Sequence, residues 1–393
     1  MTVLTHAEVA DLDAITEDEI REVCGSITKQ ISREYMAQCS RARETPTELW
    51  RVMRETGLYG LGVPQEYGGL GGHLTEVTYA LDLLGQAGLM PFRFVTSQMA
   101  RTTLRHHASE EQKQRFLVPA ATGEYQFAFA LTEADAGTNS FNIRTYAERQ
   151  PDGDYVVNGT KMWITGVHEA DYMILVARTS KYDPGSRKSG MSVFAVDPKS
   201  AGITLGALDI GIHMADRSWE VNFDNVRIPG ENLIGEEGMG LEALFDCLIP
   251  ERLLAAGLNV GLSDCVLNKT AEYARNRAPF GEPIGKYQGV QIPMAEARAA
   301  TAGARALTYQ ATRKFDAKIP SGMESDMARF LSAEAFLKSS DVAMNTHGGA
   351  ATDMQQDVIP FYLYAKFQSI APINRNVCLA AIAQREFNFP KSY

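Results

Sequence analysis

The sequence predicts an α+β protein of three domains: an N-terminal helical domain, a middle antiparallel β domain and a C-terminal helical bundle. Two changes in hydrophobic spacing indicate this order. Apolar residues recur three or four positions apart up to about residue 120, then at every second position to about residue 235, and afterwards at helical spacing again. A chain of 393 residues is long enough for two or three domains. We place them at residues 1–122, 123–236 and 237–393.

Helical spacing in the first domain is clearest in PTELWRVMRETG and TTLRHHASEEQKQRFLVPAATG, where Gly or Pro ends the apolar stripe. A glycine-rich segment, LYGLGVPQEYGGLGG at residues 58–72, separates the predicted helices. Such a segment is either a surface connector or a loop that contacts a substrate, and the sequence leaves both interpretations open.

The middle domain has four segments with the spacing of strands, each bounded by Gly, Pro, Asn or Asp: DYVVNGTKMWITG, ADYMILVART, GMSVFAVD and SWEVNFDNVRIP. Within the first, Asn158 and Gly159 predict a tight hairpin turn. Trp163 and Thr165 follow on the outgoing strand, and we expect them on one face because they are two residues apart.

The third domain begins with a long helical region, GLEALFDCLIPERLLAAGLNVGLSDCVLNKTAEYARNR. Pro250 lies inside it and is predicted to kink the helix or to mark a junction, because proline cannot donate a helical hydrogen bond. Two further amphipathic helices are predicted, in QGVQIPMAEARAATAGARALTYQATRKF and DMARFLSAEAFLKSSDVAMNTHGG.

The composition is that of an ordinary globular protein, with 45% hydrophobic and 22% charged residues. A net charge of −10 argues against nucleic acid or an anionic membrane as the main partner. We expect no membrane helix, because no uncharged apolar run reaches spanning length. The N-terminus is acidic where a targeting peptide would be basic, and the five scattered cysteines suggest neither a disulfide framework nor a zinc site. A cytoplasmic protein without a metal is expected.

Two short loops are candidates for a cofactor site. In FAFALTEADAGT, residues 127–138, a strand with Phe129 and Leu131 on one face breaks into a polar loop from Thr132 to Thr138, which would expose backbone N–H groups and hydroxyls at a sheet edge. In NGTKMWITG, residues 158–166, the indole and hydroxyl two residues apart would suit a flat cofactor ring and its polar edge. Taken singly, the first also fits an ordinary strand end and the second a core tryptophan.

Together, the two loops resemble the flavin-contacting strands of the acyl-CoA dehydrogenase family, and the resemblance extends over nearly the whole chain. The order helices, sheet, helices is also that family's architecture. The resemblance implies FAD as cofactor and an acyl-CoA thioester as substrate. In the family's reaction a carboxylate removes the α proton while the β hydrogen leaves as hydride to the flavin N5. An electron-transfer flavoprotein or a similar acceptor would then take the electrons.

The resemblance also implies which residues contact FAD. In the middle domain the predicted cofactor contacts are Phe129, Leu131, Thr132, Thr138, Trp163 and Thr165. Thr138 stands where the family usually has a serine near the FAD phosphate, and it is a predicted substrate contact as well. Asn139 replaces the aspartate of the family signature.

Further predicted FAD contacts lie in the C-terminal domain. In NRAPFGEPIGKYQ, residues Arg277, Phe280 and Gln288 match residues that reach a neighbouring subunit's FAD, which implies a homodimer or homotetramer. The same segment also fits a helix end followed by a Gly/Pro turn. In NTHGGAAT, the residues Asn345, Gly348 and Gly349 resemble the family's QxxGGxG turn, although Asn345 replaces glutamine and an alanine replaces the third glycine.

The catalytic base is predicted from what the C-terminal loop lacks. Many members of the family carry a glutamate in a YEGT-like loop, but the corresponding YAKFQSIAPINR has no acidic residue. Isovaleryl-CoA and long-chain acyl-CoA dehydrogenases take the glutamate from the helix that opens the last domain, in an ERL context, and this chain has IPERLLAAG. Glu251 is therefore the predicted base. A lone helical glutamate also fits a solvated surface residue.

The remaining predicted substrate contacts are Arg252, which would order the site, and Gln368. A backbone N–H between Gln368 and Ala371 is expected to hold the thioester oxygen, whereas Pro372 could not. Two alternatives stay open: a flavoenzyme of the same fold acting on a carrier-protein thioester, a nitroalkane or a monooxygenation substrate, and a non-catalytic paralogue that binds FAD or CoA. Acyl chain length and branching are not predicted.

Overall fold

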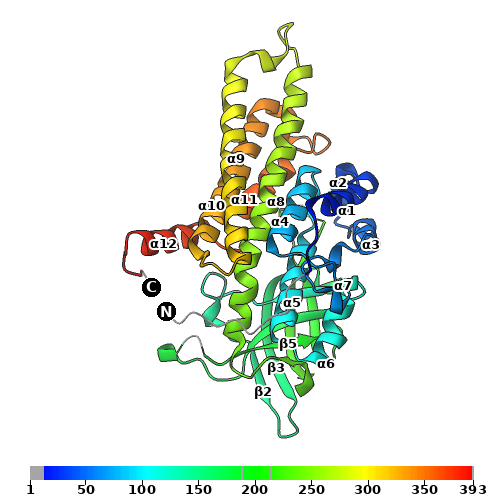
Figure 1. Ribbon diagram of the computed structural model, residues 1–393, viewed down its shortest axis with the longest axis vertical. Coiled ribbons are helices and arrows are strands. Elements are labelled where there is room, and N and C mark those ends of the chain that lie inside the picture. The colour runs from blue at the N-terminus through cyan, green and yellow to red at the C-terminus, as the bar shows by residue number, and fades with distance from the viewer. Residues whose placement is uncertain (1–12, 187–188, 213–214, 392–393) are drawn as a thin grey trace.

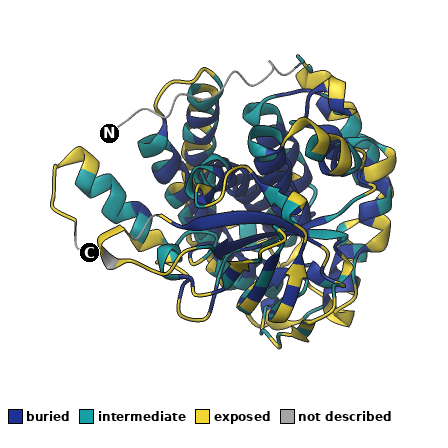
Figure 2. Ribbon diagram, turned by 90° about the horizontal axis from the view of Figure 1, so that it is seen from below, coloured by how far each residue is buried: buried dark blue, intermediate teal, exposed yellow. Residues whose placement is uncertain are grey.

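A computed structural model describes residues 13–186, 189–212 and 215–391 of the chain. An eight-stranded sheet occupies one end of the molecule, the long helices of the C-terminal domain extend away from it, and the N-terminal helices pack beside both (Figure 1). Buried residues fill the inner strands and helices, and exposed residues lie at the periphery (Figure 2). The predicted three-part α+β architecture is confirmed, whereas the boundary residues stay a prediction.

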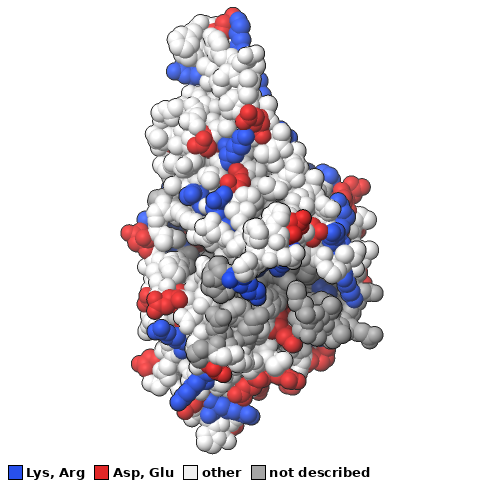
Figure 3. All heavy atoms as spheres, turned by 90° about the vertical axis from the view of Figure 1, so that its left-hand side faces the viewer, with Lys and Arg blue, Asp and Glu red and all other residues white. Residues whose placement is uncertain are grey.

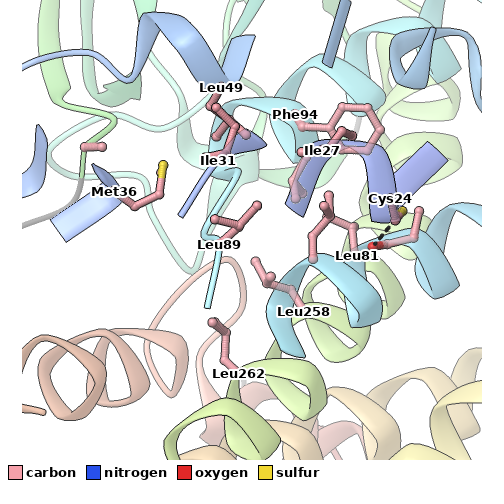
Figure 4. Packing of buried hydrophobic residues seen from close by; sticks show 14 of the residues in the cluster. Cys24, Ile27, Ile31, Met36, Leu49, Leu81, Leu89, Phe94, Leu258 and Leu262 are labelled. Atoms are coloured by element: carbon pink, nitrogen blue, oxygen red, sulfur yellow. Dashed lines mark hydrogen bonds between the residues drawn. The ribbon is translucent and has the colours of Figure 1, made fainter. Parts of the chain in front are cut away.

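The helices of the first part are α1 (Glu17–Gln30), α2 (Arg33–Ala42), α3 (Thr47–Glu55), α4 (Leu74–Gln86), α5 (Phe92–His107), α6 (Glu110–Gln112) and α7 (Val118–Thr122). Thr16 and Glu19 form a reciprocal capping box at the start of α1. Side chains of α1, α4 and α5, among them Ile27, Leu81 and Phe94, share one core with Leu258 of the C-terminal domain (Figure 4). The N-terminal helices are thereby fixed to the element that holds Glu251.

The glycine-rich segment at residues 58–72 is part of this core. Leu58, Tyr59, Leu61 and Val63 are buried, so the interpretation as a surface connector is wrong.

The strands are β1 (Phe127–Ala130), β2 (Tyr146–Arg149), β3 (Tyr155–Thr165), β4 (Tyr172–Arg178), β5 (Met191–Val196), β6 (Ile203–Ala207), β7 (Ser218–Ile228) and β8 (Leu233–Ile234). They are ordered β6-β7-β3-β2-β4-β5-β8, and β1 pairs with β4. The sheet is mixed and not wholly antiparallel as predicted, because β1 and β2 both run parallel to β4. Parallel neighbours need a crossover: the chain passes through β2 and β3 between β1 and β4, and through β3 between β2 and β4.

The predicted hairpin at Asn158 and Gly159 is also corrected. β3 runs straight through both residues, its register with β7 slips between Val157 and Gly159, and the reversal between β2 and β3 lies at residues 150–154. A Cβ on Gly159 would lie 2.6 Å from the Thr145 hydroxyl, and its φ is 146°. Glycine is therefore needed at position 159 because the backbone passes close to Thr145 and forms a bulge, and not because the chain turns there.

The C-terminal part consists of α8 (Gly240–Asn276), α9 (Gln288–Asp316), α10 (Gly322–His347), α11 (Ile359–Gln368) and α12 (Arg375–Glu386). Helix α8 continues through Pro250 as one element, so no junction divides it. It packs against α4, α5, α9 and α10, which makes it the central helix of the molecule (Figure 1). None of the helices within the described ranges has the length and hydropathy of a membrane span.

Candidate active site

The structure brings the two predicted cofactor loops together at one edge of the sheet. Met162 N donates a 2.9 Å hydrogen bond to Thr132 O, which joins the second loop to the first. Lys161 Nζ donates to Leu131 O and to Glu133 Oε1, both at 2.8 Å. We call this combined edge, residues 131–138 and 161–165, the rim.

The buried ion pair between Lys161 and Glu133 joins the two loops of the rim, and neither residue was among the predicted site residues. Glu133 also accepts from Arg144 N at 2.7 Å and Thr145 N at 3.0 Å. Burial opposes its ionisation, but Lys161 and these donors hold the pKa of Glu133 below its usual value. Burial lowers the pKa of Lys161 to about 8, and Glu133 counteracts part of that effect. The sequence signal that could have revealed this pair is that Lys161 occupies an inward-facing position of β3, next to the exposed Thr160.

The rim presents an indole and hydroxyls to the surroundings. Trp163 is 49% exposed and has a left-handed backbone, with φ of 57°, where the β3–β7 register slips a second time. This bulge breaks the strand alternation, so Trp163 and Thr165 do not share a face as predicted: Thr165 is buried. Thr138 is exposed, and an added Cβ on the neighbouring Gly137 would meet no atom within 4 Å. An accessible aromatic surface beside hydroxyls and open space fits a flavin ring and its polar edge.

Phe129 and Leu131 are partly buried and pack against the core that α5 shares with the sheet. Thr132 is also partly buried.

A second group of predicted cofactor residues lies at the opposite end of α8. Arg277 follows the last residue of α8, Gln288 opens α9, and Phe280 between them is 82% exposed. About 25 residues of helix, or roughly 38 Å, separate this connection from Glu251. Within one chain these three residues therefore do not meet the rim (Figure 1).

The glycine turn lies near the same end of the bundle. His347, just before Gly348, stacks on Tyr273 near the end of α8, with ring centroids 4.1 Å apart. Asn345 donates to Asp341 at 3.1 Å, and added Cβ atoms on Gly348 or Gly349 would meet open space.

Glu251 is on the buried face of α8 and is 8% exposed. The interpretation as a solvated surface glutamate is therefore wrong. Within the described part of the chain its carboxylate makes no ion pair or hydrogen bond. Burial raises the pKa of Glu251 to about 7, although Arg329 and Arg252 act in the opposite direction. A carboxyl group with this proton affinity is matched to proton transfer near neutral pH.

Arg252 is directed to a different carboxylate. Its Nη1 lies 2.6 Å from Asp326 Oδ1, and Arg385 Nη1 lies 2.7 Å from Asp326 Oδ2. Asp326 is buried on α10, so the three residues connect α8, α10 and α12. The charge of Arg252 is thus shared with a partner other than Glu251, as expected for a residue that orders the site.

The turn after α11 differs from the prediction in its hydrogen bonds. The N–H groups of Ser369, Ile370 and Ala371 all donate to carbonyls at the end of α11, at 2.8 to 3.1 Å. The expected free backbone donor is therefore absent from these three positions, because the helix end uses them. Gln368 is buried, and its side-chain Oε1 has no hydrogen-bond partner within the described residues.

Arg329 contacts this turn and was missed from the sequence. Its Nη2 donates to Gln368 O and to Ala371 O, the latter at 2.6 Å. The signal that could have found it is a lone arginine on a small-residue face of α10, flanked at helical spacing by Ser325, Ser332 and Ala333, all of them buried.

Comparisons with known proteins agree with this arrangement. Sequence models of the acyl-CoA dehydrogenase N-terminal, middle and C-terminal domains match residues 16–124, 128–226 and 238–387. The chain belongs to the acyl-CoA dehydrogenase family. Acyl-CoA dehydrogenase FadE12 of Mycobacterium tuberculosis (strain ATCC 25618 / H37Rv) is 30% identical over 378 residues, which are 95% of this chain and 96% of that protein.

Other relatives extend the comparison to structure. Glutaryl-CoA dehydrogenase of Desulfococcus multivorans is 31% identical over 88% of this chain and 89% of its own. The structure of a glutaryl-coenzyme A dehydrogenase with glutaryl-CoA superposes with a TM-score of 0.89 at 27% identity, covering 97% of this chain and 98% of that one. The FAD complex of PigA superposes with a TM-score of 0.87 at 25% identity, covering 95% and 99%. This acyl-CoA dehydrogenase is an oxidoreductase with FAD as its cofactor.

The buried Glu251 predicts a pH-dependent effect on stability. Its folded pKa of about 7 exceeds the usual 4.5, so the folded state binds the proton more tightly between these values and loses stability as pH rises. Glu251→Gln does not titrate and should gain about 3 kcal/mol relative to wild type between pH 4 and pH 8. Thermal and urea unfolding across that range measure the difference. A constant difference would contradict the raised pKa.

The rim ion pair predicts a second effect. Glu133→Gln leaves the buried Lys161 ammonium without a carboxylate and should lower the free energy of unfolding by about 3 kcal/mol, with loss of bound FAD. The matched control is Glu148→Gln, an exposed glutamate on β2. Urea unfolding and the flavin absorbance per subunit report the two effects. Equal stability of both variants would exclude a structural role for the pair.

Proposed function

We propose that this enzyme oxidises an acyl-CoA thioester to the trans-2-enoyl-CoA, with Glu251 as the base that removes the α proton. The burial of this carboxyl group, with a pKa near neutrality and with no hydrogen-bond or ion-pair partner among the residues that the structure describes, is the observation that supports the proposal. Glu251 also fits the sequence argument, since no acidic residue lies between Asp357 and Glu386. Acyl-CoA dehydrogenation as the general reaction follows from the family and its relatives.

In the proposed reaction the α C–H bond breaks and its proton forms an O–H bond on a Glu251 carboxylate oxygen. When bound, FAD supplies the acceptor for the hydride that leaves the β carbon. The electron pair of the α C–H bond becomes the new double bond of the product, so the substrate loses one proton and one hydride. Burial of Glu251 excludes water from the proton acceptor.

Other residues are proposed to bind and orient the two molecules. Phe129, Leu131, Thr132, Thr138, Trp163 and Thr165 would hold the flavin and its phosphate at the rim. Thr138, Arg252 and Gln368 are the proposed substrate contacts. The side-chain amide oxygen of buried Gln368 has no hydrogen-bond partner among the described residues, which supports a polar contact between this side chain and the substrate. The side chain is proposed because the neighbouring backbone N–H groups are engaged at the end of α11.

A second copy of the chain is proposed to complete the cofactor site. Arg277, Phe280 and Gln288 lie far from the rim of their own subunit, and an 82% exposed phenylalanine is an apolar group without cover in one chain. On the face drawn in Figure 3, the upper part of the bundle is mostly uncharged, with separate Lys, Arg, Asp and Glu side chains distributed over it. Together with Asn345, Gly348 and Gly349, these residues would reach a neighbour's FAD in a homodimer or homotetramer.

Two further features are proposed: an electron-transfer flavoprotein or similar protein as electron acceptor, on the resemblance, and a cytoplasmic location, on the scattered cysteines.

The base is tested with Glu251→Gln under anaerobic conditions. Mixed with straight, branched and cyclic acyl-CoAs, wild type should bleach its flavin, and the variant should keep its FAD but bleach on the order of 100-fold more slowly or not at all. Glu272→Gln, an exposed glutamate on the same helix, is the matched control. Bleaching of the Glu251 variant at the wild-type rate would remove the assignment. Oxygen consumption that requires a flavin reductase would favour monooxygenation, and a protein that takes up no FAD would favour a non-catalytic role.

The shared site is tested at the α8–α9 connection. Phe280→Ala and Arg277→Gln should weaken FAD retention on the order of tenfold, about 1.4 kcal/mol, without changing the pH profile of flavin reduction. The exposed Glu282→Gln in the same connection is the control. Flavin release on dilution and analytical ultracentrifugation provide the measurements. A monomer that keeps its full FAD content would contradict the shared site.

A further inference from the structure

Arg329 is a buried cation, and no carboxylate in the described part of the chain forms an ion pair with it. It is 1% exposed on α10, and its Nη2 spans two backbone carbonyls of the turn between α11 and α12, those of Gln368 and Ala371. Its Nε and Nη1 have no hydrogen-bond partner within the described residues. Burying an uncompensated guanidinium costs several kcal/mol, so a structural clamp alone is an expensive reason to place one here.

The titratable groups that face Arg329 come from three other helices. They are Glu251 and Arg252 of α8, Tyr364 of α11 and Cys378 of α12. Burial raises the pKa values of Tyr364 and Cys378, so both are neutral at physiological pH. Asp326 already takes the charge of Arg252.

Glu251 is thus the carboxylate, among the described residues, whose charge acts on Arg329. The effect is mutual. Burial lowers the pKa of Arg329 to about 10 while Glu251 favours the charged guanidinium, and Arg329 in turn favours the ionised form of Glu251. The geometry agrees: the Arg252–Asp326 ion pair joins the residue after Glu251 to α10 one helical turn before Arg329, and Glu251 and Arg329 are both buried between these two packed helices.

We propose that Arg329 is a positioning residue with two tasks: its Nη2 holds the turn at residues 368–371, and its charge favours the ionised form of Glu251, which accepts the substrate proton. The inference rests on the proposed role of Glu251 as base. Burial alone favours a protonated, inactive carboxylic acid, and the nearby cation opposes that tendency without bonding to the oxygens that must receive the proton. Arg329 on α10 therefore connects the turn at residues 368–371 with the carboxyl group on α8.

The test separates charge from hydrogen bonding. Arg329→Gln keeps N–H donors for the turn but removes the charge, whereas Arg329→Lys keeps the charge but offers a smaller donor group. The rate of anaerobic flavin reduction is measured from pH 5.5 to pH 9 with an acyl-CoA that bleaches the wild type. For Arg329→Gln we expect the acidic limb of the pH–rate profile, where the rate rises as Glu251 ionises, to move to higher pH by about one unit. The rate on that limb should be roughly tenfold slower than in wild type and should recover at alkaline pH.

For Arg329→Lys we expect the limb to stay at its wild-type position and the plateau rate to fall, because one ammonium does not reproduce the fork that spans two carbonyls. If Arg329→Gln does not fold, Arg329→Lys alone tests both proposed tasks of Arg329. A limb that shifts in Arg329→Lys overturns the charge task, and an unchanged plateau overturns the turn-holding task.

The matched control is Arg101→Gln. Arg101 on α5 is equally buried. It donates to Gln98 and lies over the rings of Tyr59 and Phe94, and within the described part of the chain it forms no ion pair with a carboxylate. Its removal should lower the thermal midpoint without moving the limb. If both glutamine variants lower the midpoint alike and neither moves the limb, Arg329 is a structural residue only.

The pH dependence of the unfolding midpoint tests the same charge effect without substrate. Because the Arg329→Gln substitution should raise the folded pKa of Glu251, its unfolding midpoint should decline with pH over a wider range than that of wild type, and adding Glu251→Gln should abolish the difference. Should Glu251→Gln bleach like wild type, the proposed base is wrong. Should the base hold and the limb of Arg329→Gln stay in place, only the present inference fails.

Discussion

The close approach of α8 to α4 is the constraint on which the arrangement of the domains depends. A Cβ on Gly261 would lie 2.2 Å from Asp82 O, so only glycine lets the two helices come this near. Behind the contact, buried Asp82 accepts from Arg305 Nε at 2.8 Å and Nη2 at 2.9 Å, which adds α9 to the pair. Glu251 lies fewer than three turns before Gly261 on the same helix, so this contact fixes the helix that carries the proposed base against the N-terminal helices.

Around Glu251 the charges are distributed unequally. Asp326 is paired with two arginines, whereas the charges of Arg329 and Arg252 act on Glu251 without a hydrogen bond or ion pair to it among the described residues. A fully paired carboxylate would be ionised but held by its donors, and a fully isolated one would be neutral. The structure lies between these limits, which is what a base that must both lose and regain a proton requires.

The length of α8 divides the functional groups between two ends of the molecule. The rim and Glu251 lie toward the sheet, and the exposed α8–α9 connection lies roughly 38 Å away. Because a single chain cannot fold the second group back onto the first, the proposed cofactor site becomes complete only between subunits. The same long helix that gives the bundle its core thus makes assembly part of the proposed function.

Local patterns in the sequence were enough for the three-part order of helices, strands and helices, and they also led to two candidate cofactor loops and to Glu251 as the candidate base in a chain whose C-terminal loop has no acid. Hydrophobic spacing and loop motifs reflect neighbours along the chain, and these features depend on such neighbours. The parallel pairing of β1 with β4, the bulge at Gly159 and the engaged N–H groups of the last turn depend on contacts between segments far apart in sequence. The same is true of the burial of Glu251 and of Arg329 beside it: charge and residue type are written in the sequence, but desolvation and the distance between charges exist only after the helices pack.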